Sequence, residues 1–104
     1  MKRGEVWWVE MPAPAGRRPA VLLSRDAAYR VRAAVTVAPV TRTIRDIPVE
    51  VLLDPSDGMP TRCVVNLDDI TTIPKSFIKQ RITSLSQERI QQIDEAIRFA
   101  LDLS

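Results

Sequence analysis

The stretch AGRRPAVLLSRD, residues 15–26, sets two arginines and a proline directly before a run of apolar side chains. Residues 19–24 (PAVLLS) form a continuous apolar run with the length of a buried strand. The preceding run, residues 5–11, reads EVWWVEM and is rich in β-favouring side chains. Between the two runs, residues 12–16 (PAPAG) contain the proline and glycine residues that interrupt regular structure. These residues predict two strands joined by a short loop, with both arginines just before the second strand.

Further strand-length segments follow at short intervals: residues 33–40 (AAVTVAPV), 47–53 (IPVEVLL) and 63–70 (CVVNLDDI). Pro39 lies inside the first of them and predicts a bulge or an edge position, because proline has no N–H to donate to a ladder. The connections are too short for the crossover helices that a parallel sheet needs. The spacing therefore predicts a small, SH3-like antiparallel barrel.

The last segment, residues 86–104, changes to a helical period. Its apolar positions fall on one helical face: Ile90, Ile93, Ile97, Ala100 and Leu101. Ser86 is a suitable N-cap, Glu88 lies in the first turn, and Leu85 is placed to pack on the side chain of Ile90. The fold class predicted is mainly β with a C-terminal helix.

Length and composition indicate one folded domain spanning residues 1–104. Hydrophobic residues make up 45% and charged residues 27% of the chain, values typical of soluble globular proteins. Cys63 is the only cysteine, which excludes an internal disulfide and is typical of a reducing compartment. No apolar stretch approaches the ~20 residues of a membrane span. We expect a soluble, cytoplasmic protein that does not engage a membrane.

Positive charge is concentrated in the first half of the chain. Residues 1–45 hold nine Lys and Arg against three Asp and Glu, whereas residues 46–104 hold six against ten. Twelve of the fifteen cations are arginine, whose planar fork suits phosphate recognition. This distribution is typical of a protein that binds a polyanion, nucleic acid above all. A codon bias that favours arginine everywhere would give the same composition, and composition does not separate the two.

The chain contains no histidine, which removes the usual general base at neutral pH and every Ser/His or Cys/His nucleophile. Asp68 and Asp69 are adjacent, so in a strand they would point to opposite faces and would not share a metal ion. An ion pair at a strand end is the better interpretation of these carboxylates. The sequence predicts neither a metal centre nor a cofactor.

Arginine and hydroxyl side chains remain as candidates for chemistry. Arg17 and Arg18 precede one predicted strand, and Thr41, Arg42 and Thr43 end another. If the two strand ends converge, these side chains form one cationic pocket that fits a phosphate. A fixed guanidinium there would stabilise charge developing on a phosphoryl group. The competing interpretation is that these are solvated charges at strand ends.

Six stretches, in this order and spacing, carry a resemblance to a known family: RGEVWWV (residues 3–9), GRRPAVLLS (16–24), VTVAPVT (35–41), IPVEVLL (47–53), VVNLDDI (64–70) and ITSLSQERIQQIDEAI (82–97). The chain resembles the MazF/PemK ribosome-independent mRNA interferases of bacterial toxin–antitoxin systems over nearly its whole length. This resemblance implies the MazF/PemK and CcdB-like toxin fold. It also implies sequence-specific, metal-independent cleavage of single-stranded RNA in which the substrate's own 2′-hydroxyl attacks the phosphate.

The resemblance places the family's catalytic arginine at Arg18, directly before Pro19, and its catalytic threonine at Thr41. We expect the RNA-binding residues to be Arg17, Ser24, Arg42 and Thr43. Because arginine is essentially never deprotonated in proteins, we interpret Arg18 as a phosphate clamp and proton donor rather than a base. The sequence does not identify the general base.

The resemblance further implies a homodimer and a cognate MazE-like antitoxin. Apolar residues such as Trp7, Ile93 and Ile97 are candidates for the dimer seam, although core packing explains them equally well. For Trp7 and Trp8 we favour core packing or the seam over stacking on RNA bases.

The loop of residues 12–18 departs from many family members, because it is short and has no carboxylate. A groove left open by this loop would also admit a tRNA or rRNA loop.

Two alternatives belong to other functional classes. A CcdB-like toxin has the same small barrel but binds DNA gyrase through a tryptophan-containing C-terminal tip. This chain ends ALDLS without one. An SH3-like peptide-binding module would need a groove of clustered tyrosine and tryptophan side chains, and Tyr29 is the only tyrosine here.

Overall fold

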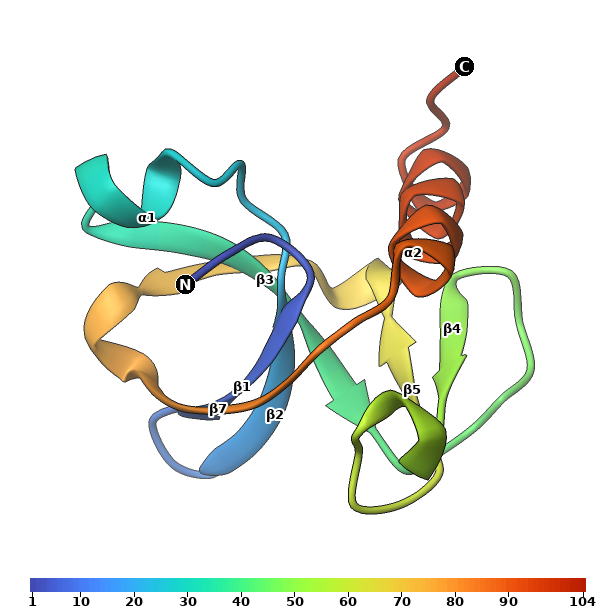
Figure 1. Cartoon of the computed structure of the whole chain (residues 1–104), viewed down its shortest axis with the longest axis horizontal. Coiled ribbons are helices and arrows are strands. Elements are labelled where there is room, and N and C mark those ends of the chain that lie inside the picture. The colour runs from blue at the N-terminus through green and yellow to red at the C-terminus, as the bar shows by residue number, and fades with distance from the viewer.

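Seven antiparallel strands and a C-terminal helix form the fold (Figure 1), seen in a computed structural model that describes residues 1–104. The strands are β1 (Glu5–Glu10), β2 (Arg17–Leu22), β3 (Ala34–Thr41), β4 (Glu50–Leu53), β5 (Cys63–Asn66), β6 (Thr71–Pro74) and β7 (Ile78–Ser84). The α-helices are α1 (Ala28–Val31) and α2 (Gln87–Ala100), and the short 3₁₀ turns are η1 (Pro55–Asp57), η2 (Leu67–Asp69) and η3 (Lys75–Phe77). The predicted mainly β class with a C-terminal helix is confirmed.

The sheet runs in the order β4-β5-β3-β2-β1-β7, and β6 pairs with β3 beside β5. β4, β6 and β7 each have a single partner strand, so no ladder closes the sheet. The antiparallel pairing predicted from the short connections is confirmed, and the predicted small barrel describes the sheet loosely, because the sheet is not closed. β4 and β7 leave backbone edges unpaired.

β3 is the central strand and has partners on both edges. On one edge it pairs with β2, and on the other it pairs first with β6 through Ala34–Val37 and then with β5 through Val40 and Thr41. Pro39 lies between these last two ladders, where neither β6 nor β5 requires an N–H from it. On that edge Pro39 stands at a break in the pairing, as the expected edge or bulge position implies, although its pairing with Ala20 of β2 on the other edge is regular.

The two faces of the sheet pack into two separate apolar clusters, because successive strand residues point to opposite sides. On β2, Val21 enters the cluster beneath α2, whereas Ala20 and Leu22 enter the cluster beside α1. The larger cluster holds thirteen buried residues, among them Leu53, Leu67 and Ile93. Together the clusters fix the positions of both ends of β2 and β3.

α2 begins where the sequence predicts, since the Ser86 hydroxyl accepts a hydrogen bond from the Arg89 N–H at 3.2 Å. Ile93 is buried, and Ile90, Ile97 and Ala100 pack at its sides, as their spacing predicts. Leu101 is an exception: it follows the last helical residue and is 57% exposed. No helix of the chain is both long and apolar enough to cross a membrane.

Several predicted boundaries differ from the structure. Arg17 and Arg18 are the first two residues of β2, although the predicted strand began at Pro19. β4 begins at Glu50 rather than Ile47, and β5 ends at Asn66 rather than Ile70. Asp68 and Asp69 lie in η2, where the Asn66 side chain accepts from the Asp68 N–H at 3.0 Å and donates to the Asp69 carboxylate at 2.9 Å. Neither carboxylate forms the predicted ion pair. α1, β6 and β7 were not predicted.

Candidate functional site

The start of β2 and the end of β3 lie side by side, because the two strands are antiparallel and pair through Ala20 and Pro39. A cavity of about 620 Å³ opens at this point. Its lining comes from β1, β2, β3 and the chain leading into β5: Trp8, Arg17, Arg18, Pro19, Val40, Thr41, Arg42, Thr43, Met59, Pro60, Thr61 and Cys63. We call it the strand-end pocket.

The strand-end pocket is cationic. Three arginines line it and no aspartate or glutamate does, although acidic side chains are nearly as numerous as basic ones in the whole chain. The structure thus brings together five of the six predicted site residues: Arg17, Arg18, Thr41, Arg42 and Thr43. Such a lining favours an anionic ligand.

Arg18 has a fixed but largely unoccupied guanidinium group. Its Nε donates a hydrogen bond to the Ala15 carbonyl at 2.9 Å, within the turn that joins β1 to β2. No carboxylate pairs with Arg18, so both terminal nitrogens of the fork remain free to bind a ligand. A planar fork held at one nitrogen and open at two is suited to an oxyanion.

Arg17 is held differently from Arg18, although both are exposed. Its guanidinium lies over the Trp8 ring, 4.9 Å from the ring centroid, and a terminal nitrogen is 3.6 Å from the Glu10 carboxylate. The other terminal nitrogen donates to the Gln80 side chain at 3.3 Å. With its charge already matched by Glu10, Arg17 is less available than Arg18 to a reacting phosphate.

The two adjacent tryptophans face opposite ways, as expected of neighbouring strand residues. Trp8 is half-buried and lines the strand-end pocket. Trp7 packs beside the cluster near α1, and its indole N–H donates to the Glu5 carboxylate at 3.0 Å. Burial acts to raise the pKa of Glu5, but hydrogen bonds from Trp7 and the Lys2 N–H outweigh it and hold that pKa below its usual value.

Thr41 offers a free hydroxyl proton. Its side-chain oxygen accepts a hydrogen bond from the Thr43 N–H at 3.2 Å, so the hydroxyl hydrogen can be directed into the pocket. Arg42 is exposed and makes no hydrogen bond or ion pair with the rest of the chain. The end of β3 therefore adds a hydroxyl donor and an unpaired cation opposite Arg18.

Ser24, which was expected to bind RNA, does not line the strand-end pocket with the other five residues. It follows the far end of β2, where its hydroxyl accepts from the Thr36 N–H at 2.8 Å and its carbonyl accepts from the Tyr29 hydroxyl at 3.0 Å. Burial foremost raises the pKa of Tyr29 to about 12. Because this single tyrosine is buried, the aromatic groove of an SH3-like peptide module is absent.

Seven lining residues were not predicted as site residues: Trp8, Pro19, Val40, Met59, Pro60, Thr61 and Cys63. The register of β1 with β2, which sets Trp8 beside Pro19, was the signal that could have found Trp8. Nothing local in the sequence places residues 59–63 against Thr41. Burial raises the pKa of the Cys63 thiol, which keeps it protonated and a poor nucleophile.

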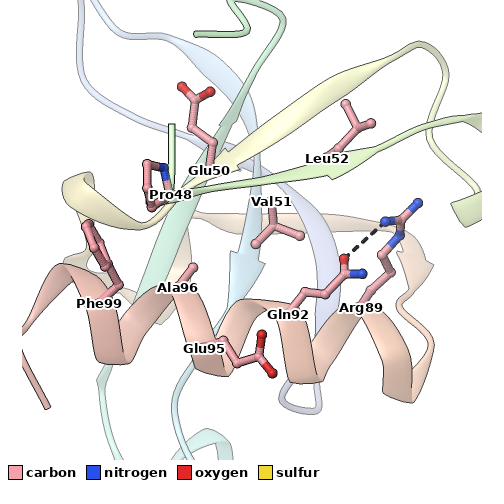
Figure 2. A pocket seen from close by; sticks show the side chains of 9 residues that line it. All are labelled: Pro48, Glu50, Val51, Leu52, Arg89, Gln92, Glu95, Ala96 and Phe99. Carbon is pink, nitrogen blue, oxygen red and sulfur yellow. Dashed lines mark hydrogen bonds between the residues drawn. The ribbon is translucent and has the colours of Figure 1, made fainter. Parts of the chain in front are cut away.

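A second cavity, of about 480 Å³, lies between α2 and β4 (Figure 2). Its lining includes the carboxylates of Glu50 and Glu95, the apolar side chains of Leu52 and Phe99, and Arg89. Hydrogen bonds from Arg45 lower the pKa of Glu50 despite its burial, so that carboxylate stays charged. Two carboxylates against one arginine make this groove a poorer match to a polyanion than the strand-end pocket.

The model of one protein family, the PemK-like, MazF-like toxins of type II toxin–antitoxin systems, matches residues 2–101. The chain belongs to this family. The resemblance indicated by the sequence motifs is thereby confirmed. Arg18 and Thr41 were matched to the catalytic residues of this same family.

Individual MazF-like proteins align over nearly the whole chain. Probable endoribonuclease MazF5 of Mycobacterium tuberculosis is 48% identical over 104 residues, covering 98% of this chain and 94% of the relative. The solved structure of M. tuberculosis toxin MazF-mt6 has a TM-score of 0.89 at 30% identity, covering 96% of this chain and 98% of that one. An endoribonuclease in complex with its cognate antitoxin, from Mycobacterial species, reaches 0.90 at 30% identity, with 100% and 97% covered.

These comparisons decide between the two toxin classes that share the fold. The matching family model and the relatives described are MazF/PemK-like, so the CcdB-like alternative receives no support. The strand-end pocket of this MazF-like toxin is therefore the place to look for its chemistry.

Proposed function

We propose that this protein is a sequence-specific endoribonuclease toxin that binds single-stranded RNA in the strand-end pocket. The observation that carries the proposal is that Arg18 and Thr41 both line that pocket. Their hydrogen bonds within the chain leave the terminal nitrogens of Arg18 and the hydroxyl hydrogen of Thr41 free to donate to a ligand. Relatives that align over nearly the whole chain are named endoribonucleases, which supports the same activity. Residues 1–104 act as one cytoplasmic toxin domain.

In the proposed reaction the substrate supplies the nucleophile. The ribose 2′-oxygen bonds to the adjacent phosphorus and the bond from phosphorus to the 5′-oxygen breaks, which leaves a 2′,3′-cyclic phosphate and a 5′-hydroxyl. No histidine, aspartate or glutamate lines the pocket, so solvent takes the 2′-hydroxyl proton. The reaction needs only positioning and charge stabilisation from the protein.

Arg18 and Thr41 divide that work between them. The free terminal nitrogens of Arg18 donate hydrogen bonds to the non-bridging phosphate oxygens. These hydrogen bonds become stronger as negative charge develops on the oxygens in the transition state. The Arg18 fork donates a hydrogen bond to the leaving 5′-oxygen, which takes its proton from solvent. The Thr41 hydroxyl donates to the same phosphate from the opposite strand, while Arg17 and Arg42 attract the neighbouring phosphates.

The turn between β1 and β2 leaves the pocket open on one side. Residues 12–15 are spanned by a backbone hydrogen bond from the Met11 N–H to the Gly16 carbonyl at 3.0 Å, a tight connection with no acidic side chain. This short turn admits a single-stranded mRNA segment and also the more bulky loop of a tRNA or rRNA.

An antitoxin of MazE-like type is the proposed inhibitor. We infer that it presents a disordered, acidic segment with apolar anchors, whose carboxylates replace RNA phosphates at Arg17, Arg18 and Arg42. Binding and inhibition would then be competitive with RNA and would weaken as salt rises. Measuring the binding of antitoxin peptide with and without an uncleavable RNA oligonucleotide tests this. Simultaneous binding with unchanged affinities would place the inhibitor at another site.

The active form is proposed to be a homodimer. Ile93, one seam candidate, is 1% exposed and belongs to the core. Leu52 and Phe99 are exposed and line the groove between α2 and β4, and Leu101 and Leu103 are exposed after the end of α2. Apolar surface of this kind beside the unpaired edge of β4 suits a second copy of the chain. Sedimentation at micromolar concentration tests this, and a monomer would contradict it.

Incubating the protein with a long RNA in the presence of EDTA, followed by a sizing gel, separates the enzyme from a gyrase-binding toxin. Discrete RNA fragments are the expected result. Intact RNA together with inhibition of gyrase supercoiling would support the CcdB-like alternative instead.

A further inference from the structure

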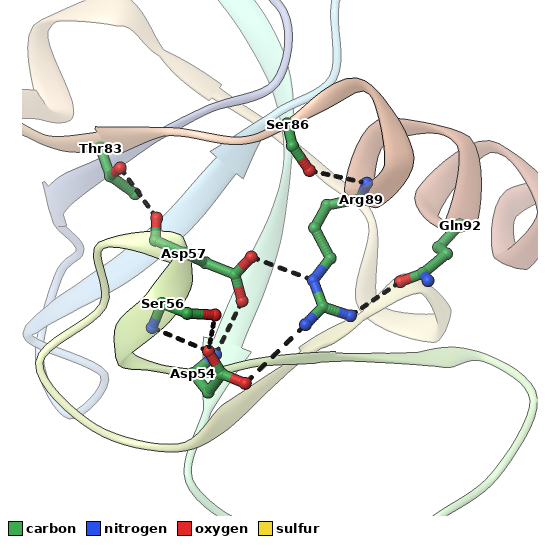
Figure 3. A network of polar contacts seen from close by, with 7 residues as sticks. All are labelled: Asp54, Ser56, Asp57, Thr83, Ser86, Arg89 and Gln92. Atoms are coloured by element: carbon green, nitrogen blue, oxygen red, sulfur yellow. Dashed lines mark hydrogen bonds and ion pairs between the residues drawn. The ribbon is translucent and has the colours of Figure 1, made fainter.

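One wall of the strand-end pocket is tied to α2 by a network of charged side chains (Figure 3). Arg89, in the first turns of α2, extends its guanidinium toward the turn η1. Its Nε donates to the Asp57 carboxylate at 3.0 Å, and a terminal nitrogen lies 3.9 Å from the Asp54 carboxylate. The other terminal nitrogen donates to the Gln92 side chain at 3.1 Å. All three nitrogens of the fork are therefore engaged.

The turn that Arg89 contacts is itself highly ordered by hydrogen bonds. The Asp57 carboxylate accepts from the Asp54 N–H at 2.9 Å, and the Asp54 carboxylate accepts from the Ser56 N–H at 2.8 Å, which together make a capping box. The Asp57 carbonyl accepts from the Thr83 hydroxyl of β7 at 2.9 Å. The turn is thus held from two sides, by α2 and by β7.

Gly58 fixes the direction in which the chain leaves this turn. Its φ of +94° lies in the left-handed region, and a Cβ at this position would collide with the Thr83 side chain. The chain then enters Met59, which is buried, and continues through Pro60 and Thr61, which line the strand-end pocket. Met59 lines the pocket as well, so only Gly58 separates Asp57 from the pocket wall.

The contact between Arg89 and Asp57 is a hydrogen-bonded ion pair rather than apolar packing. The two side chains are 21% and 9% exposed, so the ion pair is largely removed from water. A mostly buried ion pair is weak evidence for stability, because well-packed apolar residues of the same volume often serve as well. A charge-assisted hydrogen bond instead fixes distance and angle, which is what a pocket wall needs.

From these contacts we propose that Arg89 is a positioning residue that holds residues 59–61 as the wall of the RNA-binding pocket. The inference rests on the proposed function, since it assigns the wall to the nucleotides flanking the cleaved phosphate. Arg89 touches neither Arg18 nor Thr41, so its loss changes substrate binding and leaves the chemical step intact.

The test uses Arg89→Met, which keeps the aliphatic stem and removes the fork. Its matched control is Arg98→Met, a change of the same kind at an exposed position of the same helix that makes no ion pair. Hydrogen exchange is measured at the Asp57 and Gly58 amides, which donate to the Asp54 and Pro55 carbonyls at 2.9 and 3.0 Å. Steady-state cleavage of an RNA oligonucleotide is measured in parallel.

The expected result for Arg89→Met is faster exchange at both amides and a KM about tenfold higher, with kcat unchanged, because binding shared by ground and transition states is lost. Arg89→Lys should recover part of the KM, since an ammonium can reach Asp57 but cannot form the fork. Arg98→Met should match the wild type in every measurement. Unchanged exchange in folded Arg89→Met, or faster exchange with unchanged KM, would overturn the proposal.

If Arg89→Met does not fold, Asp57→Asn tests the same contact from the other side, because the amide keeps an acceptor for Asp54 and loses the charge. Faster exchange and a higher KM are again expected, and wild-type values for both would overturn the proposal. A wild-type protein that cleaves no RNA would refute the proposed function. The exchange rates would then still decide whether Arg89 holds the loop.

Discussion

Replacing Arg18 by alanine should reduce kcat for RNA cleavage by about 10²–10³-fold, the effect of losing one donor to a developing oxyanion, equivalent to about 2.7–4 kcal/mol. The estimate follows from the geometry of the guanidinium. Its Nε is occupied by the Ala15 carbonyl at 2.9 Å, and both terminal nitrogens face the pocket without a partner. Alanine removes both free donors together with the positive charge, so the one-donor figure is the smallest loss expected.

The same geometry predicts that the fold survives the substitution. Arg18 is exposed and makes no ion pair, so the free energy of unfolding should change by no more than about 0.5 kcal/mol. Cleavage of a fluorogenic RNA oligonucleotide gives kcat and KM, and urea unfolding followed by tryptophan fluorescence gives stability. Arg25→Ala is the matched control, because Arg25 is an exposed arginine just beyond the other end of β2.

Arg18→Lys refines the test. Lysine restores the charge but not the planar fork, so its kcat should fall between those of the wild type and Arg18→Ala. Folded Arg18→Ala protein with a kcat within threefold of the Arg25→Ala control would refute the assignment of Arg18 to the reacting phosphate.

Three further outcomes are expected. Thr41→Ala should lower kcat by about 10²-fold in the oligonucleotide assay, because it removes the second donor to the phosphate, and an unchanged kcat would remove Thr41 from the mechanism. Arg17→Ala should mainly raise KM and reduce the slope of log binding constant against log salt by about 1, and an unchanged slope in a salt titration would exclude a phosphate contact. The folded-state pKa of Glu5 lies below its usual 4.5, so its contribution to stability is complete above that value and is lost as the pH falls through the folded pKa. Urea unfolding from about pH 6 down to about pH 3 should therefore show a smaller loss of stability in Glu5→Gln than in the wild type, and equal losses would contradict the shift.

Much of the fold follows from local patterns in the sequence. The apolar run after Pro19, the β-favouring run around Trp7 and Trp8, and the Ser86 cap each specify an element without help from the rest of the chain. β6 and β7 lack such a signal: TTIP buries only Ile73, and IKQRITS presents exposed residues at Lys79, Gln80 and Arg81. Their strand conformation depends on pairing with β3 and β1, which is a tertiary effect.

The residues of the candidate site likewise fall into those that local sequence predicts and those that depend on tertiary contacts. Arg18 and Thr41 could be matched because each stands at the end of a strand that the sequence itself predicts. Ser24 lies apart from them because it follows the opposite end of β2, which in an antiparallel pair faces the start of β3. The wall formed by Pro60 and Thr61 depends on Arg89, a contact across 32 residues of sequence, and no local pattern predicts it.

The measurement that tests the central claim most directly is the mass of the RNA fragments produced by the wild-type protein in EDTA. Cleavage by the substrate's own 2′-hydroxyl predicts fragments ending in a 2′,3′-cyclic phosphate and fragments beginning with a 5′-hydroxyl, together with no cleavage where the scissile ribose is 2′-deoxy. Fragments that begin with a 5′-phosphate, or activity that EDTA abolishes, would contradict the account.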